Sequence, residues 1–304
     1  MTARPLAPEP MLVAAAADRR EPTVESPWQL FWQRFRRNRL AVAGLVVCLL
    51  LILASLFAPL LAPHDPLQIS ILDKFAPPGS PGYPLGADEV GRDLLSRLLW
   101  AGRISLLVGF AAMAVTISVG SAVGLVSGYF GGRTDATLMR LTDALLCFPT
   151  VFLLLVLASF VGASLLSITL IIGLTSWMEL ARILRNQTLS LRRRDFVQAS
   201  EALGASHARL IARHLLPNTL APILVAATLN IANAVLAESY ISYLGYGIQP
   251  PEASWGNMLN NAQSYFNAAP WVALFPGVLI TLTVAGFNFV GDGLRDALDP
   301  RSLR

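Results

Sequence analysis

The stretch FVQASEALGASHARLIARHLLPN, residues 196–218, is the longest polar segment with a helical pattern between two strongly apolar segments. Small or apolar residues recur in it at steps of three and four, which predicts a short helix with one apolar face. Gly204 interrupts the pattern, where a residue without Cβ lets two helical pieces meet at an angle. Pro217 suits the first turn of the next helix, since its missing N–H would have no partner there. The stretch therefore predicts an arm exposed to another protein. The residues expected on its apolar face are Phe196, Ala199, Ser200, Leu203, His207, Leu210 and His214.

The composition surrounding this arm is that of a membrane protein. Of 304 residues, 54% are hydrophobic and 14% charged, which is too apolar for an ordinary soluble domain. A helix needs about twenty apolar residues to cross a bilayer. The sequence therefore predicts an all-α, polytopic membrane protein with six transmembrane helices. The expected spans are 40–61, 104–126, 138–161, 166–183, 219–243 and 271–290.

The segments between and before the spans differ in composition. Residues 1–27 are rich in Ala, Pro, Arg and Glu and are expected to form a flexible cytoplasmic tail. Residues 28–39, WQLFWQRFRRNR, mix aromatic rings with arginines, which predicts an amphipathic helix at the membrane interface. Residues 40–304 are expected to form the six-span domain, with an external loop at 62–102 and a cytoplasmic loop at 184–218.

The distribution of basic residues predicts the orientation. Of the 23 Lys and Arg residues, all but four fall on the side that holds the 196–218 stretch and both termini. Cytoplasmic loops carry an excess of Lys and Arg, so both termini and the arm are expected in the cytoplasm. The four exceptions are Lys74, Arg92, Arg97 and Arg103.

The spacing within the arm resembles the EAA loop of ABC importer permeases. That loop reads Glu-Ala-Ala, three residues, Gly, nine residues, an often apolar residue, one residue and Leu-Pro. Here the corresponding positions are held by Gln198-Ala199-Ser200, Gly204, His214 and Leu216-Pro217. Gln198 replaces the family's Glu, which removes a charge but keeps hydrogen-bonding capacity, and His214 occupies the apolar position. The resemblance implies that the loop forms a coupling helix that docks on an ATPase subunit.

Three further blocks resemble the second, C-type permease of dipeptide, oligopeptide and nickel ABC importers. They are GADEVGRDLLSR at 86–97, LGYGIQPPEASWGNML at 244–259 and GDGLRDALDPR at 291–301. The resemblance implies the type I ABC importer permease fold in a bacterial inner membrane. It also implies four kinds of partner: a homologous second permease, two ATP-binding subunits, an extracytoplasmic substrate-binding protein and the lipid bilayer. The implied coupling residues are Gln198, Ala199, Ser200, Leu203, Gly204 and His207.

The sequence lacks the patterns of an enzyme. The single lysine, Lys74, does not lie in a Walker A loop, so ATP and Mg²⁺ are expected to be used by partner subunits rather than by this chain. The three histidines do not stand at metal-ligand spacing with Cys or carboxylates, so no bound metal or other cofactor is expected. No nucleic-acid partner is expected either. Two alternatives stay open: an ion-driven secondary transporter, or the same fold importing nickel or glutathione-like solutes.

Several charged residues lie in or next to the apolar segments, where ionisable groups are costly and often functional. Glu238 has no basic residue near it in sequence, and it is expected either to face the substrate pathway or to support the neighbouring loop. Three pairs of opposite charges lie one helical turn apart, and the members of each pair are expected to bind each other within their helix. These pairs are Asp93 with Arg97, Arg140 with Asp143, and Glu179 with Arg182.

Overall fold

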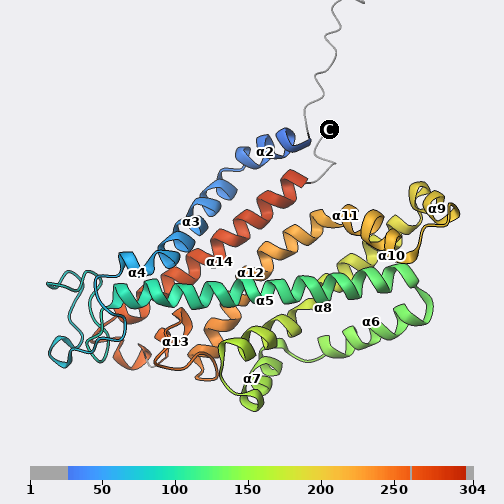
Figure 1. Cartoon of the computed structure of the whole chain (residues 1–304). Helices are drawn as coiled ribbons and strands as arrows, with labels where there is room; N and C mark the ends of the chain where they lie inside the picture. Colours follow the sequence, from blue (N-terminus) through green and yellow to red (C-terminus); the bar gives the residue numbers. More distant parts are fainter. Residues whose placement is uncertain (1–26, 261, 299–304) are drawn as a thin grey trace, which may run out of the picture.

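The protein is a bundle of long helices (Figure 1). The computed structural model describes residues 27–260 and 262–298, and these residues contain no β-strand. The predicted tail 1–27 lies outside them, except for Pro27, which begins α2. The principal helices are α2 Pro27–Arg37, α3 Arg39–Leu56, α5 Leu94–Phe130, α6 Gly132–Leu146, α7 Thr150–Val161, α8 Leu165–Arg192, α9 Asp195–Ala202, α12 Leu220–Tyr243, α13 Trp255–Leu259 and α14 Trp271–Leu298.

Five of these helices, α3, α5, α8, α12 and α14, are long and apolar enough to cross a membrane. The α6–α7 pair meets the same test together, bent by 87°. The prediction of six spans is confirmed when this pair counts as one span, and the predicted span 138–161 is then bent rather than continuous. Pro149 explains the break, because a proline disfavours helical backbone at the preceding residue and here serves as the N-cap of α7.

The longest helix is α5, which runs without a break from the last part of the predicted external loop 62–102 through the predicted second span 104–126. Its 37 residues make it about 55 Å long, which exceeds the roughly 30 Å of a bilayer's hydrocarbon core. Asp93 is its N-cap and accepts a hydrogen bond from the Ser96 N–H at 2.8 Å. The predicted Asp93–Arg97 pair is therefore wrong, since Arg97 instead pairs with Asp88 at 2.7 Å.

Glycines let α5 and α8 approach each other closely. A Cβ atom on Gly124 would lie 2.6 Å from the Ala181 carbonyl oxygen, and one on Gly128 would lie 2.6 Å from the Thr188 Cβ. Gly120 faces the Trp177 carbonyl in the same way. Only glycine fits at such contacts. The glycines at steps of four along α5 are thus a packing surface.

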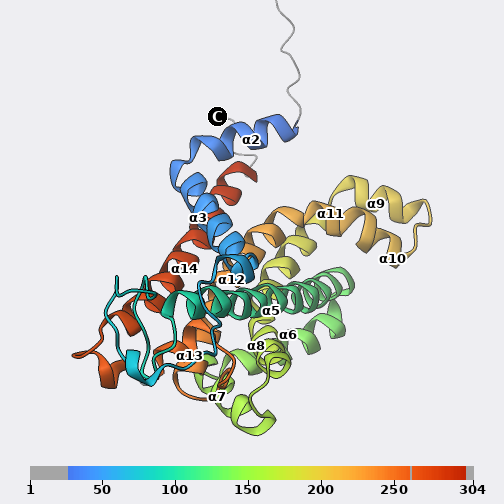
Figure 2. The ribbon, with the colours of Figure 1, turned by 60° about the vertical axis from the view of Figure 1, so that its left-hand side comes forward.

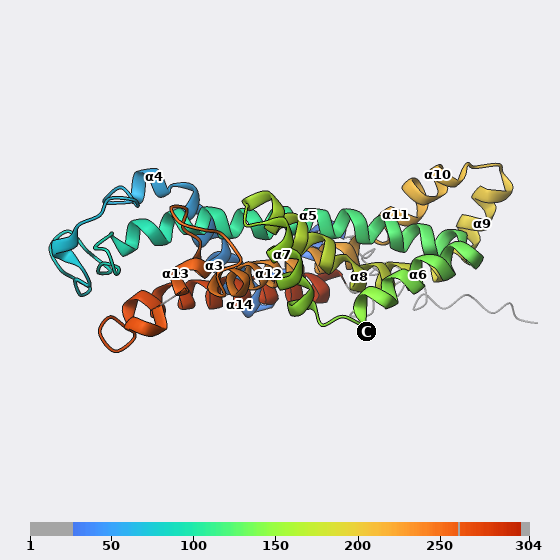
Figure 3. The same ribbon diagram turned by 90° about the horizontal axis from the view of Figure 1, so that it is seen from below.

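The elements gather at two ends of the bundle (Figures 1 and 3). The loop 62–93 and α13 occupy one end, and the segment from α9 to α11 (Leu216–Asn218) occupies the other. The last turn of α14 lies beside α2 on the side away from the 62–93 loop, where Phe35, Ala41 and Ala297 form a small core (Figure 2). The predicted 28–39 helix is present as α2, although it ends at Arg37 because Asn38 is the N-cap of α3.

Candidate functional site: the arm between α8 and α12

The 196–218 stretch forms an arm that projects from the bundle (Figures 1 and 2). It contains α9, a turn at Gly204, α10 (His207–Arg209), a π-helical turn at Leu210–Leu215 and α11. Gly204 adopts a φ of +83°, a left-handed conformation that glycine reaches without strain. Pro217 lies in the first turn of α11. The predicted hinge and the predicted proline-started helix are both present.

A small core fixes the arm to the end of α5. Val197, Leu210 and Leu215 of the arm are fully buried and pack with Leu125 and Tyr129 of α5. Val197 stands outside the predicted apolar face, and of the residues on that face only Leu210 is fully buried. The predicted phase of α9 is therefore wrong, because its inward residue is Val197.

The outward surface of the arm carries most of the predicted coupling residues. Leu203, at the C-cap of α9, has 89% of its surface exposed, and Ala199 is also exposed. No atom lies within 4 Å of where a Cβ on Gly204 would stand. Ser200 is half-buried, and the Gln198 side-chain amide donates a weak bond of 3.5 Å to the Arg193 carbonyl. Apolar side chains this exposed at a loop tip suit contact with another protein.

His207, the sixth predicted coupling residue, contacts α5. Its Nδ1 is hydrogen-bonded to the Tyr129 hydroxyl at 2.7 Å, and its ring lies edge-on to Tyr129 and Phe130. In this position His207 helps to hold the second half of the arm against the last turn of α5. Spacing within the arm cannot reveal this contact, because Tyr129 lies 78 residues earlier in the chain.

The charged residues near the arm pair between helices rather than within them. Arg182 of α8 binds Asp143 of α6, so the predicted pairs Arg140–Asp143 and Glu179–Arg182 are both wrong. One helical turn further along α8, Arg185 binds both carboxylate oxygens of Asp135. These two ion pairs hold α6 against α8 at the end that carries the arm.

Glu238 lies near the other end of the bundle, fully buried in α12. Ser105 donates a hydrogen bond of 3.0 Å to one of its carboxylate oxygens, and Ser242 donates one of 2.7 Å to the other. Each serine oxygen also accepts a backbone N–H from the 244–260 loop, that of Trp255 or Ile248. This arrangement agrees with the loop-supporting role expected for Glu238, and contact with substrate stays a prediction.

Replacing Glu238 with leucine is expected to destabilise the protein, because Ser105 and Ser242 would lose their buried acceptor. Leaving buried polar groups without partners costs about 1–3 kcal/mol each. Thermal unfolding of the purified protein in detergent measures the loss. Glu238→Gln, which keeps an acceptor oxygen, is the matched control and should unfold at a temperature between those of the wild type and the leucine variant. Equal melting of all three proteins would contradict the supporting role.

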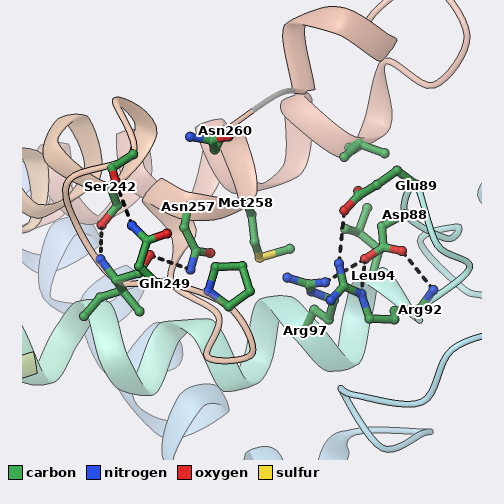
Figure 4. A pocket seen from close by; sticks show the side chains of 14 residues that line it. Asp88, Glu89, Arg92, Leu94, Arg97, Ser242, Gln249, Asn257, Met258 and Asn260 are labelled. Carbon is green, nitrogen blue, oxygen red and sulfur yellow. Dashed lines mark hydrogen bonds and ion pairs between the residues drawn. The ribbon is translucent and has the colours of Figure 1, made fainter. Parts of the chain in front are cut away.

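The 86–97 block builds a polar cavity of about 260 Å³ beside the 244–260 loop (Figure 4). Asp88 is buried there and accepts bonds of 2.7 Å from both the Arg92 and the Arg97 guanidinium. Gln249 and Asn257 line the facing wall. Asp88 thus joins the segment before α5 to the first turns of that helix, which explains why the charge of the buried Arg97 is tolerated here.

Comparison with known proteins identifies the fold. Residues 120–304 match the family described as the inner membrane component of binding-protein-dependent transport systems. Residues 26–78 match the N-terminal transmembrane domain of oligopeptide transport permease C. The chain belongs to the dipeptide/oligopeptide ABC permease family, C-type.

Relatives of this C-type permease cover nearly its whole length. The dipeptide transport system permease protein DppC of Alkalihalophilus pseudofirmus is 37% identical, over 92% of this chain and 91% of its own. The oligopeptide transport system permease protein OppC of Bacillus subtilis is 39% identical, over 91% of this chain and 90% of its own. OppC of Escherichia coli is 42% identical, over 91% of this chain and 92% of its own. This chain is therefore a membrane-embedded permease subunit of a peptide ABC transporter.

The C-type permease carries no grouped metal ligands in its described part. No three His, Cys, Asp or Glu side chains come together there as a metal site would require. His207 and His214 both lie in the arm, but His207 contacts Tyr129 and His214 lies 6.3 Å from the Phe196 ring. Their environment is that of packed aromatic side chains.

Proposed function

We propose that this chain is the second pore-forming permease of an ATP-driven importer of dipeptides or oligopeptides in the bacterial inner membrane. Its partners would be a homologous permease, two ATP-binding subunits and an extracytoplasmic substrate-binding protein. ATP and Mg²⁺ would be used by the ATP-binding subunits. The names of its relatives, which are dipeptide and oligopeptide permeases, support this substrate class.

The proposed orientation places both termini and the arm in the cytoplasm. The basic residues concentrate on that side, and the arginine-rich α2 and the end of α14 lie away from the 62–93 loop. The 62–102 region would then face the extracytoplasmic side, while the 184–218 region would meet the ATPase. The aromatic and basic side chains of α2 suit the cytoplasmic membrane interface.

The observation that carries the proposal is the arm, which is exposed on its outer surface and anchored on its inner one. Leu203 projects outward, whereas Val197 and Leu210 are buried against α5. A movement of the ATPase subunits on binding ATP would therefore move α5 and α8 together with the arm. Rigid-body movement of this kind would exchange inward for outward access to the pore.

A pull-down of the tagged chain from its native membrane in mild detergent tests the proposal. The expected result is recovery of a second permease and of subunits with Walker motifs, identified by mass spectrometry. Recovery of this chain alone, under conditions that preserve known transporter complexes, would contradict the importer and favour the secondary transporter. A copurifying binding protein, tested with peptides, nickel and glutathione, would identify the solute.

A further inference from the structure

A groove of about 570 Å³ lies among α8, α12 and α14, and it shares no lining residue with the 86–97 cavity. Its walls combine aliphatic residues with polar ones, although all three helices are membrane-spanning. A surface that faced only lipid tails would be apolar. Its polar lining residues are Ser176, Glu179, Gln187, Asn230, Asn233 and Arg295.

Glu179 is the central feature of the groove. It lies within the predicted span 166–183, one helical turn before the end of that span, and its side chain is exposed. Within residues 27–260 and 262–298 it has no hydrogen bond or ion pair, because Arg182, one turn away, binds Asp143. An ionised carboxylate at this depth cannot face hydrocarbon without a large cost. Glu179 therefore requires water or a cationic partner in front of it.

The residues beside Glu179 favour water. Asn233 of α12 is exposed and lines the same groove, as does Ser176, one turn before Glu179. Asn230 uses its side-chain N–H to bond the Ala226 carbonyl at 2.8 Å, so its side-chain oxygen stays available. Hydroxyl and amide groups such as these replace part of the hydration of a passing polar solute.

On the basis of the proposed function, we propose that this groove is one wall of the peptide path and that Glu179 binds the peptide's N-terminal ammonium group. A free peptide presents an ammonium group whatever its side chains, so one carboxylate can serve many sequences. Arg295, in the last turn of α14, lies at the end of the groove nearer the arm and offers a cation to the peptide's carboxylate. Charge-assisted hydrogen bonds are stronger than neutral ones, so a single carboxylate can contribute measurably to recognition of an ammonium group.

Cysteine accessibility tests the path. The chain has two cysteines, of which Cys48 is buried and Cys147 is exposed. The Cys147→Ser variant therefore serves as the parent, because its remaining native cysteine is buried and should react little with the reagent. Glu179→Cys and Asn233→Cys should react with a charged, membrane-impermeant thiol reagent in the assembled complex, either without nucleotide or trapped with an ATP analogue. Leu174→Cys, an exposed position of α8 outside the groove, is the matched control and should stay unreactive. If neither Glu179→Cys nor Asn233→Cys reacted, with or without the ATP analogue, the proposal that this groove lines the peptide path would be overturned.

Substitution of Glu179 tests the ammonium contact. Loss of the charged acceptor in Glu179→Gln is expected to slow peptide transport by the reconstituted complex about tenfold. Glu179→Asp should recover most of the rate, and peptide binding to the isolated binding protein should not change. Wild-type transport by Glu179→Gln would overturn the ammonium contact. Copurification of the ATPases with each variant is measured separately, so a complex that assembles normally but fails these tests contradicts the groove and leaves the proposed importer intact.

Discussion

When the tagged permease is purified from the membrane, the Leu203→Asp variant is expected to retain at least ~10-fold less ATPase than the wild type. A loss of this size is typical of a central interface residue. Leu203 is 89% exposed at the end of α9, so the substitution removes no packing from this chain. A carboxylate at that point would enter an apolar contact without a partner, which is costly. The ratio of ATPase to tagged permease after affinity purification, measured by quantitative mass spectrometry, checks this result.

Leu72→Asp is the matched control for this experiment. Leu72 is 97% exposed and lies in the 62–93 loop, at the end of the molecule away from the arm. The same change of side chain there should leave the ATPase ratio unchanged. If both variants retained the ATPase, or if both lost it, Leu203 would not be a docking residue.

The second large effect is expected from Gly124→Val, which should prevent α5 and α8 from packing. A Cβ on Gly124 would stand 2.6 Å from the Ala181 carbonyl oxygen and 2.8 Å from the Leu184 Cβ, and neither atom can move without its helix. The loss of stability should reach the upper end of the roughly 1–3 kcal/mol that overpacking costs. Thermal unfolding in detergent and the yield of monodisperse protein measure it.

Gly277→Val provides the comparison. Gly277 also lies inside a membrane-spanning helix, α14, but no atom lies within 4 Å of where its Cβ would stand. The same substitution there should change the melting temperature little. Similar melting of the two variants would show that helix propensity, rather than contact between α5 and α8, decides the effect of valine.

Much of the fold is predictable from the sequence because membrane spans depend on local composition. About twenty consecutive apolar residues suffice to indicate each span, and α3, α8, α12 and α14 lie where the hydrophobic segments predict. The hinge at Gly204 is equally local, since its left-handed backbone is a property of one residue. The bend between α6 and α7 differs from the predicted continuous span, although Pro149 is a visible signal for it.

The ion pairs cannot be predicted from local sequence, because they depend on which helices pack together. Asp143 has Arg140 one turn away, yet it binds Arg182, 39 residues further along the chain. Nothing in the spacing distinguishes the near partner from the distant one. The predicted pair of Asp93 with Arg97 fails for a local reason. Asp93 is the N-cap of α5 and lies outside the helix, so the rule for side chains four residues apart does not apply to it.

The contacts of the arm with α5 are likewise not predictable from the sequence. Tyr129 and His207 both have aromatic rings that could serve many purposes, and only the packing of α5 on the arm brings them together. Likewise, the predicted apolar face of α9 was out of phase because Val197 is the only fully buried residue of an eight-residue helix. A helix this short has too few inward positions to define a period.

The continuity of α5 has a consequence for the whole transporter. One end of this helix is capped by Asp93 and held by Asp88 beside the 62–93 loop, and the other end holds the arm through Tyr129. In the proposed importer, this one stiff element would join the surface that meets the ATPase to the surface that faces the binding protein. If the loop end and the arm bind the proposed partners and α5 transmits movement between them, a protein that favours one arrangement of the loop end would change the arm's affinity for its own partner. The arm's partner would then change the loop's affinity by the same factor.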